Sequence, residues 1–276
     1  KGANSVAENT VLGQNALDAS VSGGSLTAVG FNALTACTSG GTNTAIGRKT
    51  LEFVTTGQSN TAVGANALNK NTASNNTAVG KNALLLNTTG TGNVAVGREA
   101  LNANTTADSN TAVGDLALMA NTTGATNTAV GREALQNNTT ASDNTAVGYQ
   151  ALEENTTGST NVAVGALALD ANTTGSGNTS LGKSSLSANT TASNNTAVGN
   201  DALKLNTTGT QNVAVGSLAL RDNTTANDNT ALGHAGLLNN ETGASNTAVG
   251  KGALGNNTTA SNNVALGADT LALNTT

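Results

Sequence analysis

One phrase of seventeen residues, NTAVGREALQNNTTASD at residues 127–143, recurs with small changes along almost the whole chain. The glycine of its AVG segment marks each copy, and fourteen of the fifteen intervals between markers are 17 residues long. The remaining interval, Gly64 to Gly80, is 16 residues long. A fixed period of this size is typical of a repeat protein in which each unit packs only on its neighbours.

The repeating unit reads N-T-A-V-G-x-x-A-L-x-x-N-T-T-(G/A)-x-x. Its segments between Gly and Asn-Thr are too short for a useful helix, whereas Thr and Val favour strands and Asn and Gly favour corners. We therefore predict one coil per unit, with two short strands at NTAV and xAL. The fold expected is all-β: a β-solenoid (β-roll) of about sixteen 17-residue coils, with strands about 4.8 Å apart and a length of roughly 75 Å.

The repeat predicts a single continuous array over residues 1–276, with an irregular lead-in at 1–8 and coils from residue 9 onward. Both ends fall partway through a unit, KGANSVAENT at the start and LALNTT at the finish. We expect the sequence to be a segment of a longer protein.

Composition limits the function classes. The net charge is −5 and no basic stripe occurs, so nucleic acid is not an expected partner. No apolar run approaches the roughly 18 residues of a membrane span, and the one cysteine, Cys37, cannot form an intrachain disulfide. No catalytic triad, carboxylate pair or His/Cys cluster recurs at a fixed spacing. We expect no enzyme activity, no cofactor and no metal.

Positions that keep their character from coil to coil predict which side chains are buried. Two aliphatic ladders are expected inside, with a glycine ladder at the turn between them, whereas the residue after the glycine varies freely and is expected in solvent. Because neighbours along a strand alternate, the alanine before each valine is expected outside, as a small-residue face for another rod. The predicted inner ladders are Val113, Val130, Val147 and Leu118, Leu135, Leu152; the turn ladder is Gly114, Gly131, Gly148; the predicted assembly face is Ala112, Ala129, Ala146, Ala163.

The Asn of each Asn-Thr-Thr segment, as at Asn121, Asn138 and Asn155, allows two interpretations. It is a glycan acceptor by sequence, or a corner residue whose amide stacks on the coils above and below. The equivalent positions in the early coils include Cys37 and Val54. A position that accepts Cys and Val favours the buried ladder.

Isolated residues of chemical interest have simpler explanations. Tyr149 and His234 stand at the variable position after the glycine and are expected on the surface. Leu116, Leu167 and Leu218 place an apolar residue on the predicted solvent face in every third coil, and both chance and a lateral contact could explain that rhythm.

The phrase NTAVGREAL resembles the N-S-x-A-I-G-x-x-A phrase in the head repeats of trimeric autotransporter adhesins, and it is similar to shaft repeats of phage tail fibres. The resemblance covers the chain from about Asn9 onward. It implies a left-handed β-roll and a homotrimer of three rolls side by side in a rigid projecting fibre. The 17-residue unit, with its added NTT corner, is longer than the unit of those adhesin heads.

These observations lead to a structural hypothesis. The chain is expected to be the rod of an extracellular fibre, adhesin shaft or tail-fibre shaft, exposed at a cell surface or on a virion. Its partners are expected to be further copies of itself, as a homotrimer or filament, together with a cell-surface or matrix ligand. The alternative is a binding module whose Asn and Thr ladders recognise a repetitive ligand such as a glycan or ice. Ice would need a flat, uncharged Thr array, for which the sequence offers the NTT edge.

Overall fold

The computed structural model describes residues 8–275 and places them in two compact units, residues 8–140 and 141–275. Both units are stacks of coils with one strand per coil, and no helix occurs in the described range. The predicted all-β solenoid is confirmed. The irregular lead-in predicted for residues 1–8 lies, apart from Glu8, outside the described residues.

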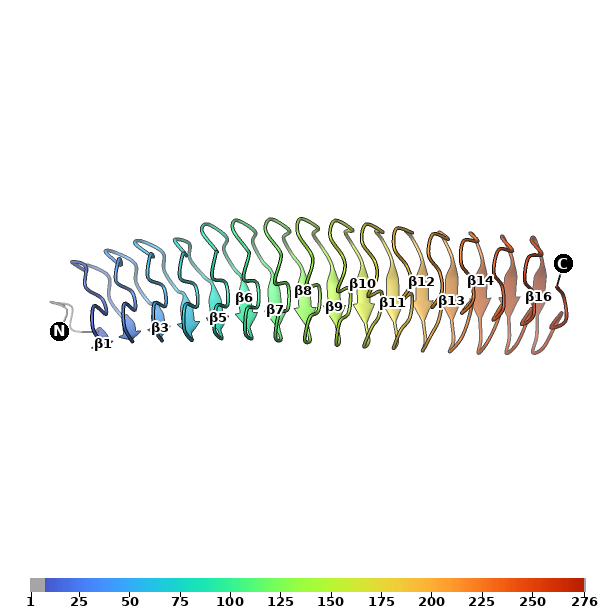
Figure 1. Ribbon diagram of the computed structural model, residues 1–276, viewed down its shortest axis with the longest axis horizontal. Helices are drawn as coiled ribbons and strands as arrows, with labels where there is room; N and C mark the ends of the chain where they lie inside the picture. Colours follow the sequence, from blue (N-terminus) through green and yellow to red (C-terminus); the bar gives the residue numbers. More distant parts are fainter. Residues whose placement is uncertain (1–7, 276) are drawn as a thin grey trace. The chain divides into compact units, whose positions relative to one another are not determined.

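Each strand is three residues long and starts directly after an Asn, except β2, which starts after Leu26. In the first unit, the strands shown side by side in Figure 1 are β1 Thr10–Leu12, β2 Thr27–Val29, β3 Thr44–Ile46, β4 Thr61–Val63, β5 Thr77–Val79, β6 Val94–Val96, β7 Thr111–Val113 and β8 Thr128–Val130. In the second unit they are β9 Thr145–Val147, β10 Val162–Val164, β11 Thr179–Leu181, β12 Thr196–Val198, β13 Val213–Val215, β14 Thr230–Leu232, β15 Thr247–Val249 and β16 Val264–Leu266.

Within each unit, every strand pairs in parallel with its sequence neighbours and without a register shift. Thr111 pairs with Thr128, for example, and Val113 with Val130. The 16-residue coil keeps this register, because Val63 pairs with Val79 and the missing residue is absorbed at the corner of residues 71–75. The shorter interval between Gly64 and Gly80 is thus a shortened corner between strands that stay in register.

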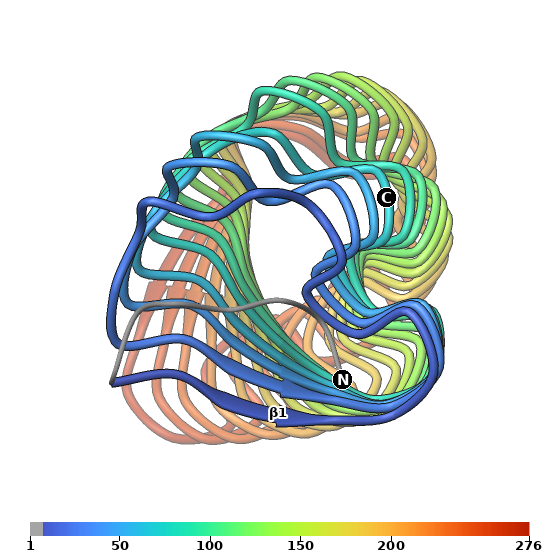
Figure 2. The ribbon, with the colours of Figure 1, turned by 90° about the vertical axis from the view of Figure 1, so that its left-hand side faces the viewer.

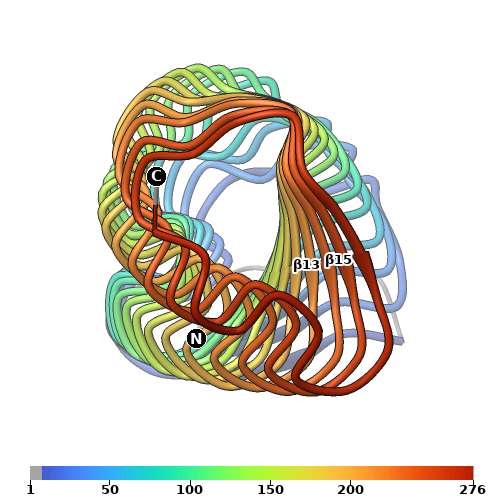
Figure 3. The ribbon, with the colours of Figure 1, turned by 90° about the vertical axis from the view of Figure 1, so that its right-hand side faces the viewer.

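The predicted second strand at xAL is wrong. That segment forms turns, and its leucines adopt the left-handed conformation, with φ of 51° at Leu118 and 52° at Leu135. Its backbone still bonds to the next coil, since the N–H of Leu118 donates to the carbonyl of Ala134 at 3.0 Å. Adjacent coils are therefore hydrogen-bonded on the turn side as well as along the sheet. Figures 2 and 3 look at the coils from the two sides and show the strand along one edge of each coil and the turns around the rest.

Candidate functional site

The strands point their middle residue inward and their two outer residues outward. Ala112, Ala129, Ala146 and Ala163 are fully buried, so the predicted assembly face of alanines is wrong. The valines next to them, predicted to be inside, lie outside: Val113 is 36% and Val130 37% exposed, and Val147 is half-buried. The alternation along the strand was right, but the side of the sheet was reversed.

The reason is the narrow space between the strand and the turn that faces it. A methyl group built on Gly236, which occupies the place of the turn alanine, would lie 3.6 Å from the Cβ of strand residue Ala231. Two facing methyl groups therefore fill this space at van der Waals distance. In the coil of β11 both facing alanines are replaced together, by Ser180 and Ser185, whose buried hydroxyls lie 2.5 Å apart. Among the sixteen strands, valine occupies the inner position only in β1, where Val11 is half-buried; in the other strands the narrow space is filled by Ala, or by Ser180 in β11.

The leucine ladder is buried as predicted: Leu118, Leu135 and Leu152 are 0% exposed. The glycine ladder has a separate cause. Gly114, Gly131 and Gly148 have φ between 137° and 143°, a conformation open mainly to glycine. A Cβ on Gly148 would also approach the carbonyl oxygen of Gly165 in the next coil to 2.5 Å. Glycine is thus required both for the turn and for the close stacking of coils.

The asparagines of the Asn-Thr-Thr segments form a buried amide ladder. Asn121, Asn138 and Asn155 are 0% exposed, and the Nδ2 of Asn138 donates to the Oδ1 of Asn121 at 2.8 Å. The Nδ2 of Asn121 also donates to the carbonyl of Gly124 at 2.9 Å. The ladder prediction is confirmed. A side chain with this burial and these bonds is not accessible as a glycan acceptor, and it cannot contact an external ligand.

A second amide ladder lies directly before the strands, except at β2. Asn110 accepts from the backbone N–H of Asn127 at 2.9 Å and donates through Nδ2 to the carbonyl of Gly124 at 2.9 Å. The hydroxyls of the first Thr in NTT continue the pattern, since the Oγ1 of Thr122 donates to the carbonyl of Thr139 at 3.0 Å. Polar groups inside and at the corner of the coil thus bond from one coil to the next.

The outward residues of the strands form a surface that we call the Thr/Val face. It has two columns, one on each side of the inward-pointing middle residue, and neither contains a charged residue. The first column holds Thr in twelve strands and Val in four (Val94, Val162, Val213 and Val264). The second holds only aliphatic residues: Val in eleven strands, Leu in four (Leu12, Leu181, Leu232 and Leu266) and Ile46 in one. We did not identify this surface from the sequence.

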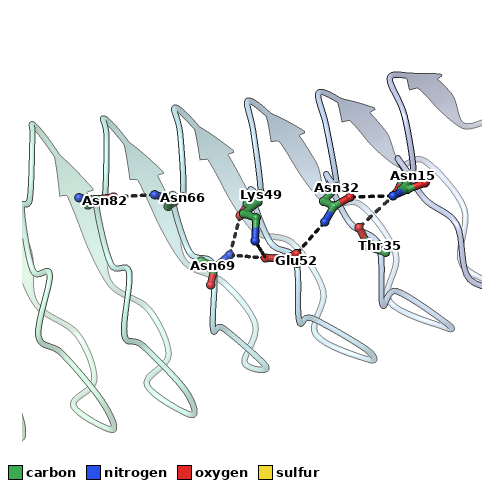
Figure 4. Close-up of polar contacts among 8 residues, drawn as sticks. All are labelled: Asn15, Asn32, Thr35, Lys49, Glu52, Asn66, Asn69 and Asn82. Atoms are coloured by element: carbon green, nitrogen blue, oxygen red, sulfur yellow. Dashed lines mark hydrogen bonds and ion pairs between the residues drawn. The ribbon is translucent and has the colours of Figure 1, made fainter.

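Charged and amide side chains gather instead on the turns. Figure 4 shows the cluster around Glu52, whose carboxylate accepts from the Nδ2 groups of Asn32 and Asn69, each at 2.9 Å. The ammonium of Lys49 lies 3.6 Å from the Glu52 carboxylate. Partial burial opposes ionisation of Glu52, but these two amides and this ammonium together outweigh it and lower its pKa. The cluster joins consecutive coils.

The same figure shows two further amide contacts between neighbouring coils on this side. Asn15 donates to the Oδ1 of Asn32 at 3.1 Å, and Asn66 donates to that of Asn82 at 3.0 Å. Such pairs, together with the bonds of Glu52, are contacts within the chain that run from one coil to the next. The arrangement links neighbouring turns.

In the described part of the chain, the reactive side chains singled out from the sequence do not converge into a chemical site. Tyr149 is 43% exposed and His234 is exposed, as predicted. Cys37 is buried at the corner, where burial raises the pKa of its thiol. Burial also raises the pKa of Asp170, whose Oδ1 has no hydrogen-bond partner. Within residues 8–275 no group of three or more His, Cys, Asp or Glu side chains is placed to hold a metal ion.

Leu116, Leu167 and Leu218, the residues of the three-coil rhythm, lie on the turns. They are half-buried and have φ values of 58° to 62°. Their backbone N–H groups bond to the preceding coil, as from Leu116 to Arg98 at 3.0 Å. Nothing in the structure explains the spacing of three coils.

No helix in the described part of the chain has the length and apolarity needed to cross a bilayer. A scan against protein-family models matches none of them, and a search of curated proteins finds no match.

Proposed function

We propose that the chain is a structural segment of an extracellular fibre, an adhesin or tail-fibre shaft exposed at a cell surface or on a virion, with no catalytic role. It acts through length, rigidity and association with further copies of itself as a homotrimer or filament. The sequence resemblance to adhesin and tail-fibre repeats supports this reading. The structure supports its coarser part, a rigid and repetitive module.

The observation that carries the proposal is the bonding between coils around the whole perimeter. Strand ladders, two amide ladders, a Thr hydroxyl ladder and turn N–H groups all join one coil to the next within each unit. Repeat proteins of this kind owe their stability to nearest-neighbour contacts. A stack joined on every side resists bending, and it can be lengthened without any new type of contact.

The alternative of a repetitive binding module loses part of its basis. The Asn ladders that it invoked are buried, so only Thr residues could contact a glycan or ice. We therefore favour the structural role, with a cell-surface or matrix ligand as an additional partner of the parent fibre.

Electron microscopy of the purified chain tests the proposal. We expect straight particles of constant width, about 70 Å long or a multiple of that, from about fifteen steps of roughly 4.8 Å. Globular particles, or strongly bent chains of variable length, would contradict a rigid shaft.

A further inference from the structure

We infer that the Thr/Val face is covered by the same face of a second copy of this chain. The inference rests on the proposed function, because it names the surface through which the proposed fibre assembles. The inner face of the sheet is covered by the turns of the same coil, whereas within residues 8–275 none of the outer valines is fully buried: seven of the eleven in the second column are half-buried, and the other four are exposed, at 36% for Val113 and 38% for Val164.

The residue type in the second column of the Thr/Val face is constrained, although none of these side chains is fully buried in its own chain. All sixteen of its residues are Val, Ile or Leu. The column after the glycine, two residues further on, contains Arg132, Tyr149, Lys183 and His234, as expected of a surface facing only water. Something outside the chain must therefore require the aliphatic column.

Strand propensity alone does not explain the column. Thr, Tyr and Phe also favour strands, and Thr occupies twelve of sixteen positions in the first column, yet none of the three occurs in the second. The two columns share backbone geometry and differ only in their place across the face. The exclusion of Thr from one of them indicates contact with an apolar surface.

The composition of the face also indicates what covers it. Val replaces Thr four times in the first column, so shape and β-branching are kept there while the hydroxyl is not. A ligand read through hydroxyls, whether a glycan or an ice lattice, would need the hydroxyl in every coil. Leu and Ile, interspersed in the second column, also make the face uneven, which suits interdigitating side chains better than a flat lattice.

A second copy satisfies the remaining requirements. Each chain has a net charge of −5, but the Thr/Val face has no charged residue, so two copies can approach there without like charges meeting. Both faces repeat once per coil, so their columns match in spacing over any number of coils. Eight strands about 10 Å wide and about 4.8 Å apart offer roughly 400 Å² per unit, against about 800 Å² per partner in a typical interface. Association is thus expected to strengthen with coil number.

Sedimentation velocity at micromolar concentration tests the inference. The face variant carries Val79→Lys, Val113→Lys and Val164→Lys, and the matched control carries Thr106→Lys, Thr123→Lys and Thr174→Lys, so both have the same charge. The three control residues are exposed and lie at the NTT corner. We expect an oligomer for the wild type and the control, and a dissociation constant raised about tenfold or more in the face variant, because unpaired lysines would be buried.

A face variant that assembles like the wild type would overturn the inference, and so would a monomeric wild type. If that monomer also inhibited ice recrystallisation, and the face variant did not, the face would be assigned to ice. If circular dichroism showed the lysine variant unfolded, the Val→Thr triple at the same positions decides, with weakened assembly expected. If electron microscopy showed straight single particles and sedimentation showed no assembly, the inference about the Thr/Val face would be wrong, but the proposal of a rigid shaft would still hold.

Discussion

Replacing one rung of the buried amide ladder should show how much each coil depends on its neighbour. Asn206 is 0% exposed and makes three side-chain hydrogen bonds. Its Nδ2 donates to the Oδ1 of Asn189 at 3.1 Å and to the carbonyl of Gly209 at 2.9 Å, and its Oδ1 accepts from the Nδ2 of Asn223 at 2.9 Å. Valine and aspartate remove these bonds in different ways.

In Asn206→Val, two of the three former partners keep another bond. The carbonyl of Gly209 still accepts from Asn195 at 2.8 Å, and Asn223 still donates to the carbonyl of Ala226 at 3.1 Å. The Oδ1 of Asn189 alone loses its donor, and one buried acceptor without a partner costs about 1–3 kcal/mol. Val54 occupies the equivalent position in an early coil and is fully buried, so the side chain fits.

In Asn206→Asp, a carboxylate oxygen replaces the donor and faces two acceptors, the Oδ1 of Asn189 and the carbonyl of Gly209. An uncompensated buried charge costs about 3–5 kcal/mol. Burial would place the folded-state pKa of this Asp above its unfolded value, so the penalty is full above the folded pKa and falls as the pH drops toward the unfolded one.

Hydrogen exchange on peptides covering residues 199–216 measures the local opening free energy. We expect the order wild type, Val, Asp, with the Asp deficit shrinking at acid pH, and a change within about 0.5 kcal/mol for the exposed control Thr208→Asp. An Asp variant no less stable than the Val variant at neutral pH would refute the donor and acceptor assignment in this ladder.

Two further predictions concern the turns. Gln211 is exposed with φ of 60°, and Gly92 and Gly177 occupy the same place in their coils with φ of 67° and 69°. Gln211→Gly should therefore raise the free energy of unfolding by about 0.5–1 kcal/mol, because glycine relieves the left-handed strain. A lower denaturation midpoint would contradict this. The lowered pKa of Glu52 means that its ionised form stabilises the fold above the unfolded pKa and that this contribution is lost as the pH falls through the folded one. Glu52→Gln should therefore reduce the loss of stability between neutral and strongly acid pH. Urea titrations at both ends of that pH range measure this loss. The prediction fails if the variant loses as much stability in acid as the wild type does.

The repeat was sufficient to predict the coil, its period, the buried Leu ladder and the Asn ladder, because each follows from a residue type that recurs in one place. The inward side of the strand was predicted wrongly, because the constant aliphatic character of the valine column was taken as a sign of burial. A sequence signal for the correct side was present. Thr128 and Val130 share one face of their strand, so burying the valines would also have buried a column of threonines.

The turn at xAL could not be predicted from residue types. Leucine has no preference for the left-handed region, so an Ala-Leu pair does not predict a φ near 50° at the leucine. The conformation is imposed by the coil, since it lets Leu135 enter the core while the segment still bonds to the neighbouring coils. The same limit applies to the Thr/Val face, whose role depends on which side of the sheet the turns cover.

The left-handed residues also explain why such a protein should depend on coil number. One 17-residue repeat includes three of them outside glycine, for example Thr126, Glu133 and Leu135, at roughly 1–2 kcal/mol each. Most of the bonds that offset this strain are made with adjacent coils, so a lone coil would carry the strain without the compensation. Stability then grows with each coil added, and the Thr/Val face lengthens in the same step. In the proposed fibre, one more copy of the repeat would therefore increase both its length and the contact surface that we infer.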